Sequence, residues 1–90
     1  MAAQGASVSY RDAMDERDLI DALSSGHIER RYFAHICAFL DEVPLPITIM
    51  ACGQVAQLSQ TAMTMIWKNV AVLAHLVGSR RATFWDLDNY

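Results

Sequence analysis

The clearest pattern along the chain is the helical spacing of apolar residues between His27 and Val43. Apolar side chains there lie at offsets of 4, 5, 8, 9, 11, 12 and 15 from Ile28, which gives a broad face with a period near 3.6 residues. Charged and polar residues occupy the other side. The pattern predicts an amphipathic helix over 27–43 that ends before Pro44, because a proline disfavours helical backbone at the residue before it.

The next segment, from Ile47 to Val77, is apolar around most of a helical circumference. Its polar residues recur at spacings of three, four and seven, which makes a narrow stripe: Gln54, Gln57, Thr61, Thr64, Lys68 and His75. Such a pattern predicts one long helix that is buried over most of its surface. Pro46 suits the first turn of this helix, and Gly78 suits a left-handed stop after it.

The length of this predicted helix is itself informative. About thirty residues at roughly 1.5 Å each span about 45 Å, whereas a small domain is about 30 Å across. We therefore expect the helix to break near Gly53 or Lys68–Asn69, or another chain to cover part of it, or both. Closed dimers are the commonest soluble oligomers, so a homodimer is the first expectation.

A shorter helix is expected near the N-terminus, from Ser9 to about Leu23. Ser9 is its predicted N-cap, with Asp12 three residues on, and Gly26 suits the left-handed residue after its end. Residues 1–8 are mostly small and polar and are expected to be a disordered leader before a single domain over 9–90. The predicted fold class is all-α: a short N-terminal helix, then an antiparallel helical hairpin with one long apolar helix, assembled as a dimer.

Composition adds a demand for partners. Hydrophobic residues make up 53% of the chain, more than a 90-residue core absorbs, and only 19% are charged. The excess predicts a partner, a membrane or a ligand pocket. A span of the bilayer needs about 20 apolar residues, and polar residues interrupt every such stretch, so no membrane is expected. The interrupting residues are Gln54, Gln57, Gln60, Lys68 and Asn69. The net charge of −3 disfavours a nucleic-acid partner.

Catalytic and metal-binding patterns are weak. Two cysteines and three histidines lack the usual spacings of a zinc site, and the four glycines are too scattered for a phosphate loop. Cys37 lies on an apolar helix face, where burial disfavours a reactive thiolate. No cofactor, metal site or catalytic residue is predicted. With no secretory signal at the N-terminus and two thiols expected to be reduced, we expect a cytoplasmic protein.

The remaining hypothesis is protein association through apolar and aromatic side chains, the usual anchors of interfaces. The residues predicted to make these contacts are Met63, Ile66, Trp67, Val70, Leu73, Phe84 and Trp85. We interpret the chain as a small non-catalytic regulator, an inhibitor, antiactivator or adaptor, that binds itself and another protein such as a transcription regulator. Two alternatives stay open: a subunit of a larger complex, and a dimeric enzyme or ligand-binding protein with Arg30, Arg31 or Lys68 converging at the subunit interface.

Overall fold

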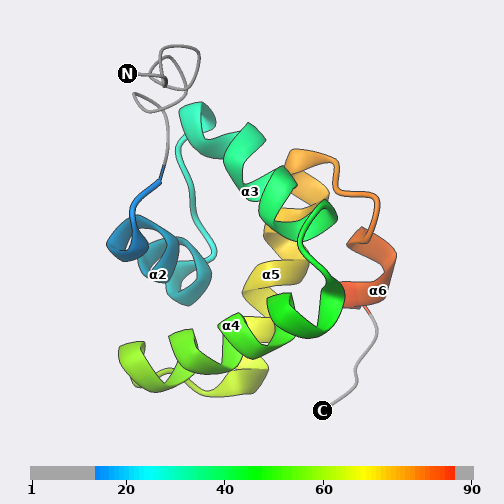
Figure 1. The fold of residues 1–90 in the computed structure, drawn as a ribbon. Helices are drawn as coiled ribbons and strands as arrows, with labels where there is room; N and C mark the ends of the chain where they lie inside the picture. Colours follow the sequence, from blue (N-terminus) through cyan, green and yellow to red (C-terminus); the bar gives the residue numbers. More distant parts are fainter. Residues whose placement is uncertain (1–13, 87–90) are drawn as a thin grey trace, which may run out of the picture.

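The computed structural model describes residues 14–86, and every regular element in this range is a helix (Figure 1). The elements in chain order are α2 (Glu16–Ser25), the 3₁₀ turn η1 (Arg30–Tyr32), α3 (Phe33–Asp41), α4 (Leu45–Ser59), α5 (Met63–Val77) and α6 (Ala82–Asp86). The predicted all-α class is confirmed. The leader over 1–8 and the Ser9–Asp12 segment lie outside the described residues.

Helix α5 lies at the centre of the molecule, and α2, α3, α4 and α6 all pack against it (Figure 1). One side of α5 is fully buried, with Ile66, Val70 and Leu73 at 0% exposure. The other helices contribute buried side chains to the same core: Leu23, Ile36, Leu40, Cys52 and Trp85. A single chain therefore assembles a filled core around this helix.

The predicted long helix over 47–77 is wrong, because the chain turns between α4 and α5. Gln60 adopts a left-handed conformation with φ 55°, and the amide of Thr61 donates back to the Ala56 carbonyl at 3.0 Å. The Ser59 hydroxyl also donates to the Val55 carbonyl at 2.7 Å. These bonds satisfy carbonyl groups in the last turn of α4, although the left-handed residue there is not a glycine. The turn lets α4 and α5 each bury one face in the same core.

Both predicted positions for a break lie inside intact helices. Gly53 is within α4, and Lys68 and Asn69 are within α5. The predicted ends are confirmed: Pro46 lies in the first turn of α4, and Gly78 follows α5 in a left-handed conformation with φ 73°.

The first described helix begins later than expected. Asp15 is the N-cap of α2: its carboxylate accepts from the Asp18 amide at 2.8 Å, while the Asp18 carboxylate accepts from the Asp15 amide. This reciprocal pair is a capping box. The predicted stop at Gly26 is confirmed, with φ 76°.

The end of α2 at Gly26 also contacts Asn69 of α5. The Asn69 side-chain amide of α5 donates to the carbonyls of Leu23 and Ser24 at 2.9 and 3.0 Å, which caps the C-terminal end of α2. A Cβ at Gly26 would lie 2.8 Å from the Asn69 Oδ1 atom. Both the backbone angle and the space therefore require glycine here.

The helix predicted over 27–43 is shorter than expected. The amide of His27 donates to the Ser25 hydroxyl at 3.1 Å, and Glu29 has extended backbone, so the helical turns begin only at Arg30. Ile28 reaches the core from this extended connection and is buried. The helical spacing of apolar residues therefore included Ile28, although this side chain fills its place in the core from the extended connection before the helix.

The C-terminal end of α3 is fixed by the loop that follows α5. The Arg81 guanidinium donates to the carbonyls of Leu40 and Val43 at 3.0 and 2.8 Å. The Asp41 carboxylate, only 10% exposed, accepts from the Ser79 hydroxyl at 2.5 Å and from the Arg80 amide at 3.1 Å. The loop thus ties α3 to the end of α5 and sets the position of α6.

Candidate interaction surface

The residues predicted to contact a partner lie on α5 and α6. Ile66, Trp67, Val70, Leu73 and Trp85 are buried in the core of the single chain, and Met63 and Phe84 are half-buried. The Trp67 and Trp85 ring centroids are 4.6 Å apart, and the Phe84 ring meets Trp85 edge-on at 5.2 Å. Phe84 and Trp85 thus lie on the short helix α6, which packs against α5. The contact of these seven residues with another protein stays a prediction.

The exposed large apolar side chains of α4 and α5 are different residues: Ile47, Met50, Leu58, Met65, Val72 and Leu76. They lie beside the polar stripe that the sequence marks along these helices. Met50 is four residues before Gln54, and Met65 and Val72 flank Lys68 at three and four residues. The stripe therefore indicated the outward direction correctly, and its apolar neighbours at helical spacing were the signal that sequence reasoning missed.

We define the α4 face as the exposed side of α4 formed by Ile47, Met50, Gln54, Gln57 and Leu58. It lies on the opposite side of the helix from the buried residues Thr48, Cys52 and Val55. Its side chains are apolar groups and amides, and none carries a charge. The face can therefore be covered by a partner without the cost of desolvating an ion.

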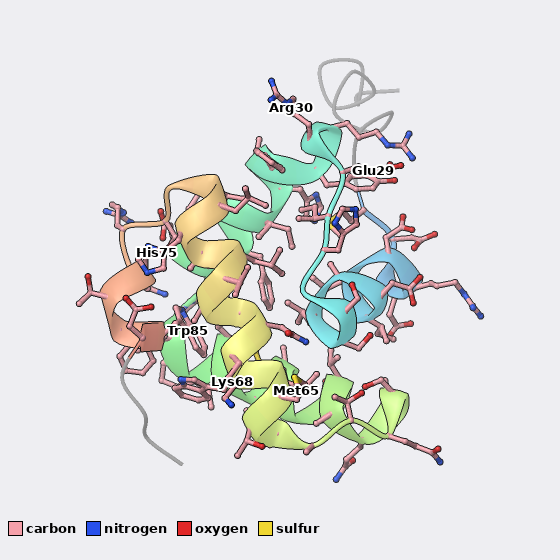
Figure 2. All side chains as sticks on the ribbon, turned by 180° about the vertical axis from the view of Figure 1, so that it is seen from behind. Glu29, Arg30, Met65, Lys68, His75 and Trp85 are labelled. Carbon is pink, nitrogen blue, oxygen red and sulfur yellow. The ribbon has the colours of Figure 1, made fainter. Side chains whose placement is uncertain are left out.

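We define the α5 face as the exposed side of α5 formed by Met65, Lys68, Val72, His75 and Leu76. Figure 2 shows α5 in front, with Met65, Lys68 and His75 along it. The His75 ring nitrogen Nε2 lies 2.7 Å from the Asp86 carboxylate of α6, so this histidine is held to one side. Three apolar side chains with a cation among them form an amphipathic surface suited to a partner helix.

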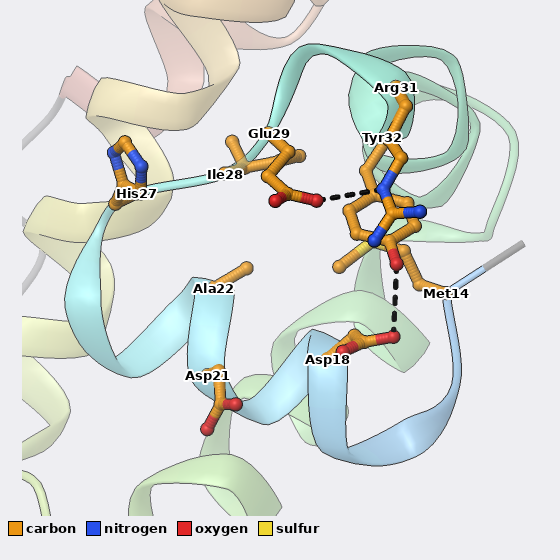
Figure 3. A pocket seen from close by; sticks show the side chains of 9 residues that line it. All are labelled: Met14, Asp18, Asp21, Ala22, His27, Ile28, Glu29, Arg31 and Tyr32. Atoms are coloured by element: carbon orange, nitrogen blue, oxygen red, sulfur yellow. Dashed lines mark hydrogen bonds and ion pairs between the residues drawn. The ribbon is translucent and has the colours of Figure 1, made fainter. Parts of the chain in front are cut away.

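A hollow of about 290 Å³ lies between α2 and the connection over 27–32 (Figure 3). Two of the three carboxylates that line it are engaged within the chain: Asp18 accepts from the Tyr32 hydroxyl at 3.4 Å, and Glu29 pairs with Arg31 at 2.7 Å. The third is Asp21. The residues that line the hollow include no Ser, Cys, Thr or Lys that could act as a nucleophile beside a general base.

The two cysteines are free and weakly nucleophilic. Burial raises the pKa of the Cys52 thiol to about 12. Burial, together with the Asp41 carboxylate 3.6 Å away, also raises the pKa of Cys37. Both thiols are therefore protonated at neutral pH. Within residues 14–86, no group of three or more His, Cys, Asp or Glu side chains is placed to hold a metal ion.

The cations that an enzyme at a subunit interface would use do not converge within one chain. Figure 2 shows Arg30 and Lys68 far apart along the molecule. The Arg31 guanidinium pairs with Glu29 and lies 4.7 Å from the centre of the Tyr32 ring. An anion-binding pocket built from these three cations would have to be completed by another chain.

Comparisons with known proteins give no relative from which a function could be transferred: no family model, curated protein or solved structure matches the chain. Among the described helices, none combines the length and the apolar character that crossing a bilayer requires.

Proposed function

We propose that the chain is a small non-catalytic protein-binding regulator that acts through the exposed faces of α4 and α5. The observation that carries the proposal is six large apolar side chains, each about half exposed or more, on two helices whose other sides already fill a core. Scattered exposed apolar residues are ordinary, whereas rows of them at helical spacing are typical of binding surfaces.

The α5 face is the surface that we assign to another protein. Met65, Val72 and Leu76 are spaced seven and four residues apart, which aligns them on one side of the helix. Removing apolar surface from water contributes about 25 cal/mol per Å², so burying this row favours association. Lys68 lies between the apolar side chains and favours an acidic group on the partner.

A regulator of this kind acts by covering a surface of its partner. When the α5 face binds, it occludes the apolar surface that the partner uses for its own dimerisation or for a ligand. This is the inhibitor or antiactivator form of the hypothesis, and a transcription regulator is one class of protein with such surfaces. Two free cysteines are typical of reducing compartments, which supports a cytoplasmic location.

The test compares partner capture by the wild-type chain with capture by two variants. Val72→Glu places a charge on the α5 face, and Ala34→Glu places the same charge on an exposed position of α3 as the matched control. A stoichiometric partner is identified by mass spectrometry and its affinity is then measured by calorimetry. We expect Val72→Glu to weaken binding at least about tenfold, because it replaces an apolar contact by a carboxylate that must lose its water and that competes for Lys68, and Ala34→Glu to bind normally. Equal binding by Val72→Glu and the wild type would refute the assignment.

A further inference from the structure

We infer that the α4 face binds the same face of a second copy of this chain, in a symmetric dimer. The inference rests on the proposed protein-binding function and names the partner of one of its two surfaces. It assigns self-association to α4 and leaves the α5 face free for the other protein.

The absence of charge on α4 is the first support. Of the α-helices described between residues 14 and 86, α4 is the one without a single Asp, Glu, Lys or Arg. In a symmetric dimer the same patch meets itself, so any charge near the axis faces a like charge. The α5 face has Lys68 at this place, and α2 exposes Glu16 and Asp21, with Asp15 at its N-cap. The α4 face alone among these avoids such repulsion.

The amides of the α4 face supply the second support. Gln54 is exposed near the middle of a row that begins at Ile47 and ends at Leu58, and Gln57 is exposed near its end. An amide has both a donor and an acceptor, so a glutamine can pair with its own copy across a two-fold axis. The face is therefore self-complementary in hydrogen bonding as well as in charge.

Space beside the row is consistent with close approach of a second helix. Apart from the backbone of α4 itself, a Cβ built at Gly53 meets no atom of residues 14–86 within 4 Å, although glycine in a helix interior costs about 1 kcal/mol relative to alanine. Gly53 lies three residues after Met50 and four before Gln57, at the edge of the α4 face. A neighbouring backbone can approach here without meeting a side chain.

The size of the face sets the expected strength. Fifteen residues of α4 span about 22 Å, and one helix face buries less than the roughly 800 Å² per partner of a standard interface. The dimer is accordingly expected to dissociate on dilution, with the mass of the particle rising from the 10.0 kDa of one chain towards twice that value as concentration increases.

The test is sedimentation equilibrium of the full chain at concentrations from about 10 µM to 1 mM, a range suited to a small interface. Gln54→Glu and Gln54→Lys each place like charges across the axis, so each variant alone is expected to stay monomeric. Mixed in equal amounts, the two place opposite charges there, and the mass should return towards that of a dimer. Lys68→Glu on the α5 face is the control and should dimerise as the wild type does.

Met50→Ser tests the same face without adding charge and should weaken the dimer at least about tenfold. Circular dichroism establishes that each variant is folded. A wild-type mass of one chain at every concentration, a mixture that stays monomeric, unchanged dimerisation of Met50→Ser, or loss of the dimer in Lys68→Glu would each overturn the inference. None of these results alters the α5 comparison with Val72→Glu, so the two proposals fail separately.

Discussion

Asn69 is the side chain whose replacement tests the packing of α5 on α2 most directly. Its amide donates two hydrogen bonds to the end of α2, and its Oδ1 atom occupies the space above Gly26. In Asn69→Ala both donors are lost, and two partly buried carbonyls at the helix end lose their partner. At about 1 kcal/mol for each bond, the free energy of unfolding should fall by about 2 kcal/mol.

Asn69→Asp makes the prediction sharper because the shape of the side chain is conserved. The new carboxylate faces two carbonyl oxygens at the negative end of the α2 dipole, which disfavours its charged form and raises its pKa above the value of about 3.9 in the unfolded chain. The folded state then binds more protons than the unfolded state. The free energy of unfolding must therefore fall as pH rises from about 3.9 through the folded pKa of the new carboxylate. At pH 7 the variant should be less stable than Asn69→Ala.

Urea unfolding followed by tryptophan fluorescence measures both effects. For a chain of this size, a loss of about 2 kcal/mol lowers the melting temperature by about 8–16 °C. Lys68→Ala, at the exposed neighbouring position, is the control and should change stability by less than about 0.5 kcal/mol. An Asn69→Asp variant as stable as the wild type at pH 7 would show that the amide does not cap α2. So would a loss of stability relative to Asn69→Ala that is as large at pH 3 as at pH 7.

The remaining predictions concern other single positions. The Ser79 hydroxyl and the Arg80 amide lower the pKa of Asp41, so its contribution is present above about pH 4 and is lost as pH falls through the folded pKa. Asp41→Asn should cost about 2 kcal/mol at pH 7 by urea unfolding, and the cost should shrink as pH falls below about 4. Gly26→Ala should destabilise more than Gly78→Ala, because both have positive φ but open space lies beside Gly78; equal melting temperatures would contradict this. Raised pKa values predict that a thiol reagent labels Cys52 in native protein at pH 8 far more slowly than in denaturant.

Much of the fold follows from apolar spacing and from punctuation by glycine and proline. The all-α class, the stops at Gly26 and Gly78 and the proline in the first turn of α4 all rest on residues with strong local preferences. The turn at Gln60 could not be found in the same way. Glutamine has no preference for positive φ, and the turn is favoured by tertiary burial of α4 and α5 together with the local bonds of Ser59 and Thr61.

The candidate interaction surface could likewise be predicted only in part. The pattern identified α4 and α5 as too apolar for solvent on all sides, and their polar stripe marked the exposed direction. It could not decide which apolar side chains the chain buries itself, because that depends on how α6 folds back onto α5. Trp67 and Trp85 pack on each other within the core, so the exposed residues next to the stripe are the ones that we propose for partners.

The most direct measurement uses two methionines as native reporters, since Met50 lies on the α4 face and Met65 on the α5 face. Side-chain oxidation of both is followed by mass spectrometry in dilute protein, in concentrated protein, and with a captured partner. If these faces bind proteins, both methionines react readily when dilute, Met50 becomes protected as concentration rises, and Met65 becomes protected when the partner is added. Oxidation rates of both residues that stay the same under all three conditions would contradict the assignment of either face as a binding surface.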